Sequence, residues 1–122
     1  MIANNLFGVC EALIYGQKSG LNLDQMVQLL SKGAAGSFQL SGLAPRILKR
    51  DLDPGFFVEH FVKDLGIALD ECKRMGIALP GMSQSTQFFH AYVAQGGAKR
   101  GTHGLIEVLE KMNNMQIDKY DI

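Results

Sequence analysis

The residues best suited to chemistry lie close together in the stretch PGFFVEHFVKDLGIALD, which runs from Pro54 to Asp70. It contains Lys63 beside Asp64, a histidine one turn earlier and aromatic residues after a Pro-Gly turn. Lysine and carboxylate side chains are among the groups that position charge and protons in active sites. The question is whether this stretch has an ordinary solvent-facing surface or forms half of an active site.

Other residues that catalyse reactions or bind metals are scattered along the chain. The three histidines, at 60, 90 and 103, form no HxxxH pattern, and the two cysteines form no CxxC pattern, so we predict no metal site. Cys10 and Cys72 fall within apolar helical patterns without a nearby histidine, which favours buried thiols over nucleophiles or a disulfide. His103 precedes a predicted helix and is interpreted as a surface or capping residue.

The candidate residues are predicted to lie on one helix, which runs from Val58 to about Met75. Its apolar residues recur at helical spacing, and His60, Lys63 and Ile67 fall on the opposite side of a helical wheel. By periodicity alone, a solvated face with one stray isoleucine is favoured, because single exposed apolar residues are normal. The alternative is a second surface that contacts another domain.

The remaining sequence predicts an all-α helical bundle of about six helices, with no strand and a single domain over residues 1–122. The other helices are expected at 1–20, at 21–33 with Asn22 as cap, after Ser37 with interruptions at Gly42 and Pro45, from Ser83 through Val93, and at 105–115. Residues 95–104 are expected to form a flexible basic loop, and residues 116–122 a frayed polar tail.

The first helix is unusual because it is apolar over much of its surface and has no N-cap signal. Such a helix is usually central and buried, and its abrupt start suggests a truncated chain. A frayed native N-terminus is the alternative.

Composition excludes several classes of function. Twelve basic and twelve acidic residues give zero net charge, so nothing favours nucleic-acid binding. No apolar run is long enough to cross a membrane. Met1 is not followed by the basic region of a signal peptide. The two thiols suit the reducing environment of the cytoplasm. Neither GAAGS at 33–37 nor the glycines at 96–101 match a phosphate-binding motif.

Three stretches of the sequence are informative when taken together: GLNLDQMVQLLSKGAAGSFQL, PRILKRDLDPGFFVEHFVKDLGIALDECKRMGIALPGMS and GTHGLIEVLEK. The set is similar to the C-terminal domain of the β-hydroxyacid dehydrogenases. This family includes 3-hydroxyisobutyrate dehydrogenase and tartronate semialdehyde reductase (2-hydroxy-3-oxopropionate reductase). They cover nearly the whole chain in order. The ordered set indicates the family strongly and the substrate weakly.

The resemblance implies a fold like that of the 6-phosphogluconate dehydrogenase C-terminal domain, joined to an N-terminal Rossmann domain that binds NAD or NADP. The active site would lie in the cleft between the two domains. Lys63 matches a lysine that contacts the cofactor, and Asp64 matches the acid that orients the catalytic lysine. Phe56 matches an aromatic residue that lines the nicotinamide and substrate pocket. The face carrying Lys63 and Ile67 would then meet the other domain.

This chain departs from the family pattern at both ends. The catalytic lysine of the family belongs to a Lys-x-x-Asn-Asn-like motif, and an ungapped alignment of CEALIYGQKSGL places that motif before Met1. Asn4 and Asn5 are therefore not assigned to it. The Rossmann fingerprint and the Ser-Gly-Gly substrate loop are also absent. Gly101 and His103 stand where relatives often have Asp and Ser.

The resemblance further implies the reaction and the partners. The complete enzyme would oxidise a small hydroxy acid or reduce a semialdehyde, and the catalytic lysine would exchange the proton. A homodimer or homotetramer is expected, because the long first helix packs in subunit contacts in the family. This chain alone is expected to be inactive. The alternative is a stand-alone helical dimerisation or interaction module without catalysis.

Overall fold

The protein is built from six α-helices, one π-helical turn and one 3-10 turn, and the computed structural model describes all residues 1–122. The elements in chain order are α1 (Ile2–Lys18), α2 (Leu23–Leu30), η1 (Gln39–Leu43), α3 (Ala44–Leu48), α4 (Val58–Met75), α5 (Pro80–Ala94), η2 (Thr102–Leu105) and α6 (Ile106–Met112). There is no strand, only one isolated β-bridge between Phe57 and Gly101. The all-α prediction with about six helices is confirmed.

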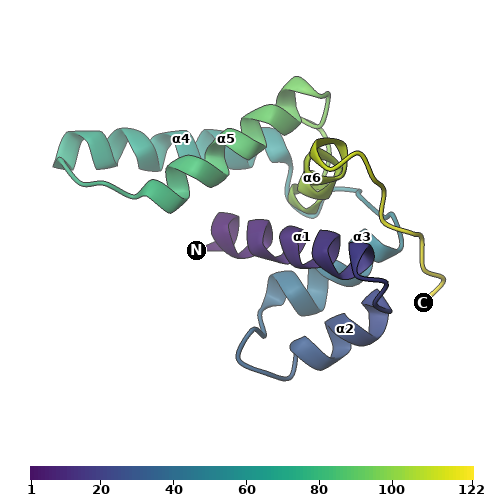
Figure 1. Cartoon of the computed structure of the whole chain (residues 1–122). Coiled ribbons are helices and arrows are strands. Elements are labelled where there is room, and N and C mark those ends of the chain that lie inside the picture. Colours follow the sequence, from purple (N-terminus) through teal and green to yellow (C-terminus); the bar gives the residue numbers. More distant parts are fainter.

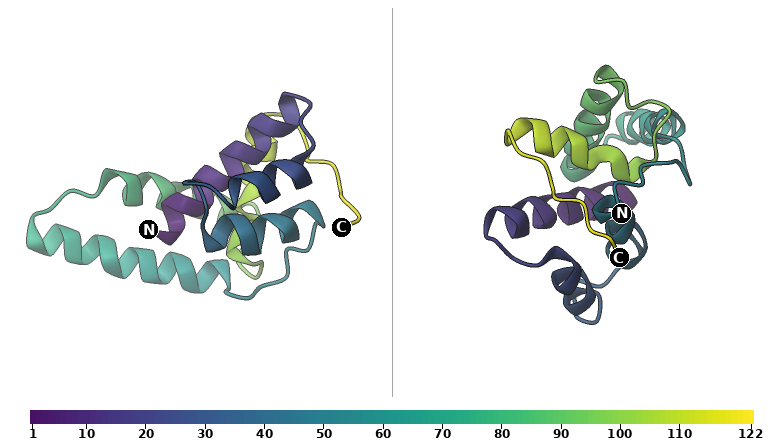
Figure 2. Two further views of the ribbon diagram at one scale, coloured as in Figure 1. Left: turned by 90° about the horizontal axis from the view of Figure 1, so that it is seen from below. Right: turned by 90° about the vertical axis from the view of Figure 1, so that its right-hand side faces the viewer.

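Helix α1 lies at the centre of the molecule. In Figures 1 and 2 it lies between α2, η1 and α3 on one side and α4, α5 and α6 on the other. Leu6, Cys10 and Leu13 on its inner face are fully enclosed, and this burial raises the pKa of the Cys10 thiol far above its usual value. The prediction of a central, buried first helix is confirmed, although Ile2 at its start is 54% exposed. No side chain caps the N-terminus of the helix, as predicted.

Helices α4 and α5 form a hairpin that extends away from the other helices (Figures 1 and 2). Helix α4 ends where predicted, because Gly76 adopts the left-handed conformation that stops a helix, with φ of 68°. Helix α5 begins at Pro80, three residues before the predicted start at Ser83. Proline suits the first turn of a helix because its fixed φ is already helical and its missing N–H has no role there.

The C-terminal tail is ordered against the body, so the prediction of a frayed tail is wrong. Ile117 is buried, and its backbone N–H donates to Glu110 Oε1 at 2.9 Å. The Tyr120 N–H donates to the Leu48 carbonyl at 2.9 Å, and its hydroxyl accepts the Leu23 N–H at 3.1 Å. The tail therefore ties α6 to α2 and α3.

The turn between α3 and α4 is fixed by one arginine. The Arg46 guanidinium donates to both carboxylate oxygens of Asp51, at 2.8 and 3.0 Å, and to the Asp53 carbonyl at 2.8 Å. This pairing lowers the pKa of Asp51 to about 2. The backbone then continues into α4, where the Val58 N–H donates to the Arg100 carbonyl at 3.0 Å.

His103 lies beneath the same turn, so the prediction that it is a surface or capping residue is wrong. It is 1% exposed, and its Nε2 lies 2.7 Å from the Asp51 carbonyl oxygen. Burial lowers the pKa of His103 because a charged imidazole is poorly solvated there. The loop that carries it is packed as well, since Gly97 and Gly104 lie against the ring of Tyr92.

Replacing Leu13 by alanine is expected to lower the free energy of unfolding by about 3 kcal/mol, because Leu13 is fully enclosed and its loss leaves a cavity. Urea unfolding followed by circular dichroism measures this change. Leu29→Ala is the control, because Leu29 is exposed on α2 and should change stability by less than about 0.5 kcal/mol. Equal losses in the two variants would contradict a core centred on α1.

Lowering the pH from about 7 to 5 is expected to destabilise the fold. In the unfolded chain, His103 takes up a proton near pH 6.5, whereas in the fold its pKa is lower. Protons therefore bind more readily to the unfolded state as the pH falls. The charge of Arg46 also lowers the pKa of His103, whereas Asp51 and Asp53 raise it. Burial has the largest effect, so the pKa is lowered. Asp51, with its pKa near 2, lowers the stability further only below about pH 4.

Urea unfolding at several pH values measures this dependence. His103→Gln should reduce the slope of stability with pH. His90→Gln is the control, because His90 is exposed on α5, and it should keep the slope. An unchanged slope in His103→Gln would assign the effect to other groups.

Candidate functional site

An open pocket of about 580 Å³ lies beside the first turns of α4. This volume suits a small ligand. Segments distant in sequence meet around it: the start of α1, η1, α3, the turn before α4, α4 itself and η2. The lining residues are Ile2, Phe38, Gln39, Leu43, Arg46, Gly55, Phe56, Phe61, Asp64, Thr102 and His103. We treat this pocket as the candidate site.

Two of the three site residues predicted from sequence, Phe56 and Asp64, line this pocket, and Lys63 lies next to Asp64 outside the lining. Lys63 Nζ is 3.5 Å from Asp64 Oδ1, and the two side chains are 64% and 52% exposed. An exposed ion pair of this kind is weak. Both charged groups are therefore available to a partner outside the chain.

Phe56 belongs to an aromatic group at the entrance to α4. Its ring packs edge-on against Phe61 at a centroid distance of 6.1 Å and lies 6.3 Å from His60. His60, Lys63 and Ile67 are all exposed, as the helical wheel predicts. The outer face of α4 therefore combines an aromatic ring, a charged pair and an aliphatic residue beside the pocket.

Phe38 and Leu43 are pocket residues that sequence reasoning missed. They lie on the same side of the chain because η1 is a π-helical turn, in which the Ala44 N–H bonds to the Gln39 carbonyl five residues back. Pro45 favours this register because it has no N–H to give to a carbonyl four residues earlier. The interruption at Gly42 and Pro45 was predicted, but its π register was not.

Thr102 and His103 are the second group that sequence reasoning missed. Both line the pocket, although they are 8% and 1% exposed. Gly101 permits this arrangement, because a Cβ there would collide with Cε1 of the His103 ring. The two glycines in GTHG were the available signal, because Gly101 lies against the imidazole and Gly104 lies against Tyr92.

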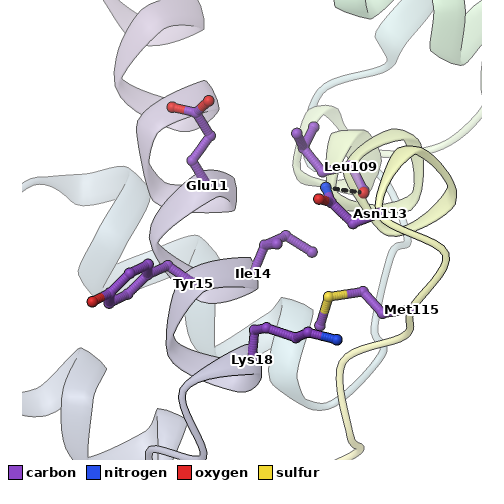
Figure 3. A pocket seen from close by; sticks show the side chains of 7 residues that line it. All are labelled: Glu11, Ile14, Tyr15, Lys18, Leu109, Asn113 and Met115. Atoms are coloured by element: carbon purple, nitrogen blue, oxygen red, sulfur yellow. Dashed lines mark hydrogen bonds between the residues drawn. The ribbon is translucent and has the colours of Figure 1, made fainter.

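A second hollow of about 350 Å³ lies between α1 and α6. Figure 3 shows Ile14 of α1 pointing toward Leu109 and Met115 across it, with the Asn113 amide bonded to the Leu109 carbonyl at 2.9 Å. Its charged residues, Glu11 and Lys18, both come from α1 and form no ion pair. No set of polar groups converges there, so this hollow is not the candidate site.

The chain offers no metal site and no membrane-spanning helix. No three histidine, cysteine, aspartate or glutamate side chains are close enough to hold a metal ion together, and no helix has the length and apolar character needed to cross a bilayer. The candidate pocket itself is lined by apolar residues together with a few polar ones.

Comparison with known proteins places the chain in a family. Residues 1–109 match the family model described as NAD-binding of NADP-dependent 3-hydroxyisobutyrate dehydrogenase. The chain is 47% identical over 120 residues to the probable 3-hydroxyisobutyrate dehydrogenase-like 1, mitochondrial, of Arabidopsis thaliana, covering 98% of this chain and 36% of that protein. It is 32% identical over 117 residues to 2-hydroxy-3-oxopropionate reductase of Escherichia coli, covering 96% of this chain and 40% of that protein.

The fold agrees with these matches. A crystal structure of 3-hydroxyisobutyrate dehydrogenase from Salmonella typhimurium superposes with a TM-score of 0.81 at 25% identity, over 88% of this chain and 38% of that one. The chain thus spans less than half the length of each of these proteins. The resemblance to the β-hydroxyacid dehydrogenases is confirmed. With a match over most of its residues, this chain belongs to the NAD-binding family of NADP-dependent 3-hydroxyisobutyrate dehydrogenases.

Proposed function

We propose that residues 1–122 form the helical C-terminal domain of an NAD(P)-dependent β-hydroxyacid dehydrogenase. The complete enzyme would oxidise 3-hydroxyisobutyrate-like hydroxy acids or reduce the corresponding semialdehydes. The observation that carries this proposal is the open pocket, with Phe56 and Asp64 in its wall and Lys63 at its rim. Such a surface suits half of a site, because Lys63 and Asp64 have no strong partner within the chain.

The residues around the pocket fit a nicotinamide cofactor, NAD or NADP, as their ligand. Phe56 is 46% exposed and offers an aromatic wall for a planar ring. The Lys63 ammonium, paired only with its neighbour, is free to contact a phosphate or other acceptor. When bound, the nicotinamide takes or gives the hydride. A Rossmann domain outside these residues would supply most of the binding surface.

Asp64 is assigned to hold a proton-carrying lysine from outside these residues. Its carboxylate lines the pocket and is 52% exposed, so it can accept a hydrogen bond from an incoming ammonium. That lysine would exchange a proton with the oxygen of the substrate. Asp64 is thus a positioning residue, and its loss would alter the pKa of the lysine as well as its orientation.

We also propose that the enzyme assembles as a homodimer or homotetramer and works in the cytoplasm. Exposed apolar residues on the projecting hairpin, Ile67, Met75, Ile77 and Leu79, support burial against another part of the protein or a second copy. The two free, buried cysteines suit a reducing compartment.

Lys63→Ala in the protein that contains this chain and its Rossmann domain is expected to weaken NADH or NADPH binding roughly tenfold, because a charged hydrogen bond to the cofactor is lost. Fluorescence titration measures the dissociation constant. Lys73→Ala is the matched control, because Lys73 is also exposed on α4 but lies near its far end. An unchanged affinity of Lys63→Ala for the cofactor would contradict the assignment of Lys63 to cofactor binding.

The chain of 122 residues alone is expected to show no dehydrogenase activity, because it contains neither the catalytic lysine motif nor a dinucleotide-binding motif. The assay follows nicotinamide absorbance with purified chain, cofactor and 3-hydroxyisobutyrate. Turnover by a pure preparation would overturn the proposed division of the site between two domains.

A further inference from the structure

Helix α1 is joined to α5 by a polar contact at its first turn. The hydroxyl of Ser85, a residue that is 1% exposed, donates to Asn4 Oδ1 at 2.7 Å. Gly81, one turn earlier on α5, lies directly against the Asn4 amide, because a Cβ there would come within 2.6 Å of Asn4 Nδ2. The Asn4 amide is thus held between two positions of α5, although Asn4 as a whole is an exposed residue.

This contact has a direction, whereas the packing beside it does not. Further along the same two helices, the rings of Phe7 and Phe88 lie 4.5 Å apart. Apolar packing of this kind is non-directional, but a hydrogen bond weakens when its donor and acceptor move out of line. The Asn4–Ser85 bond is the only side-chain hydrogen bond between α1 and α5. It is therefore suited to fix the rotation of α1 about its own axis.

The same turn of α1 also contributes to the candidate pocket. Ile2 lines the pocket, and Asn4, two residues later, lies about 200° further around the helix axis. The bond to Ser85 therefore anchors the back of this turn to α5 while the front faces the pocket. In the proposed enzyme, the proton-carrying lysine comes before Met1 and must reach Asp64, which lines the same pocket.

We propose that Asn4 and Ser85 are positioning residues, which fix the rotation of α1 and thereby direct this lysine toward Asp64. The proposal rests on the proposed function, because the lysine belongs to a helical segment of the complete enzyme that leads into α1. A side chain about 5–6 Å from the helix axis moves by about 1 Å for each 10° of rotation. A misplacement of about 1 Å can slow a reaction roughly 100-fold. Neither Asn4 nor Ser85 lines the pocket, so both act through α1.

The test measures the rate of hydride transfer in a single turnover of the complete enzyme with 3-hydroxyisobutyrate, followed by nicotinamide absorbance. A single turnover separates the chemical step from product release. Asn4→Ala is expected to lower this rate roughly tenfold. The dissociation constant of the cofactor should change less than about twofold, because the proposed cofactor contacts, Lys63 and Phe56, are untouched.

Stability distinguishes this role from a merely structural one. In Asn4→Ala the Ser85 hydroxyl can donate to the Gly81 carbonyl of its own helix, which lies 3.0 Å away. No buried polar group is then left without a partner, so the midpoint of urea unfolding should stay nearly unchanged while the rate falls. Ser85→Ala and the double variant should be as slow as Asn4→Ala, because all three lack the same bond.

Thr86→Val is the matched control for Ser85→Ala. Thr86 is the next residue of α5 and is also buried, but its hydroxyl donates to the Met82 carbonyl at 2.7 Å within the same helix. Thr86→Val therefore removes a buried hydroxyl from α5 without touching α1. It should keep the wild-type rate of hydride transfer.

The outcomes separate this inference from the proposed function. A complete enzyme that turns over neither 3-hydroxyisobutyrate nor its semialdehyde overturns the proposed function and this inference with it. In an active enzyme, four results overturn the inference alone: an unchanged rate in Asn4→Ala, additive losses in the double variant, an equal loss in Thr86→Val, or a parallel loss of cofactor affinity. A loss of rate that Asn4→Ala and Ser85→Ala share, with unchanged cofactor affinity, supports it.

Discussion

The Arg46–Asp51 ion pair is the interaction on which the geometry of the site depends. It is bidentate, and the same guanidinium also holds the Asp53 carbonyl. Asp51 in turn anchors His103 through its backbone oxygen. The turn that presents Phe56 and starts α4 is therefore held by charge-assisted hydrogen bonds, which impose direction as well as energy. Apolar packing alone would leave the orientation of this turn less defined.

The apolar core contributes differently, because it holds the elements that carry these polar contacts in fixed positions. Helix α1 is enclosed by the other helices, and its burial is what brings η1, α3 and η2 around one pocket. Packing of this kind is non-directional, so it can hold the elements together while the hydrogen bonds set the details. This division explains why the wall of the pocket is fixed within this chain, whereas the charged side chains at its rim, Lys63 and Asp64, stay exposed.

Much of this arrangement follows from local sequence signals. The apolar periodicity of α4, the Asn22 cap and the end of α4 near Met75 are all confirmed, and so is the outward face of α4. Two of the failures, the burial of His103 and the order of the C-terminal tail, share one physical cause. His103 is buried by a partner 52 positions away, and the tail is held by a Tyr120–Leu23 contact across 97 positions. A local pattern carries no information about such partners.

The π-helical turn η1 makes the pocket sensitive to chain length as well as to residue type. A turn of this kind accommodates one more residue than α-helical geometry would. Removing that residue would restore a continuous helix and rotate everything before it by about 100° relative to α3. Phe38 would then leave the pocket wall, while Arg46 would keep its place. The length of this turn, and not only its residue types, therefore decides which side chains reach the pocket wall.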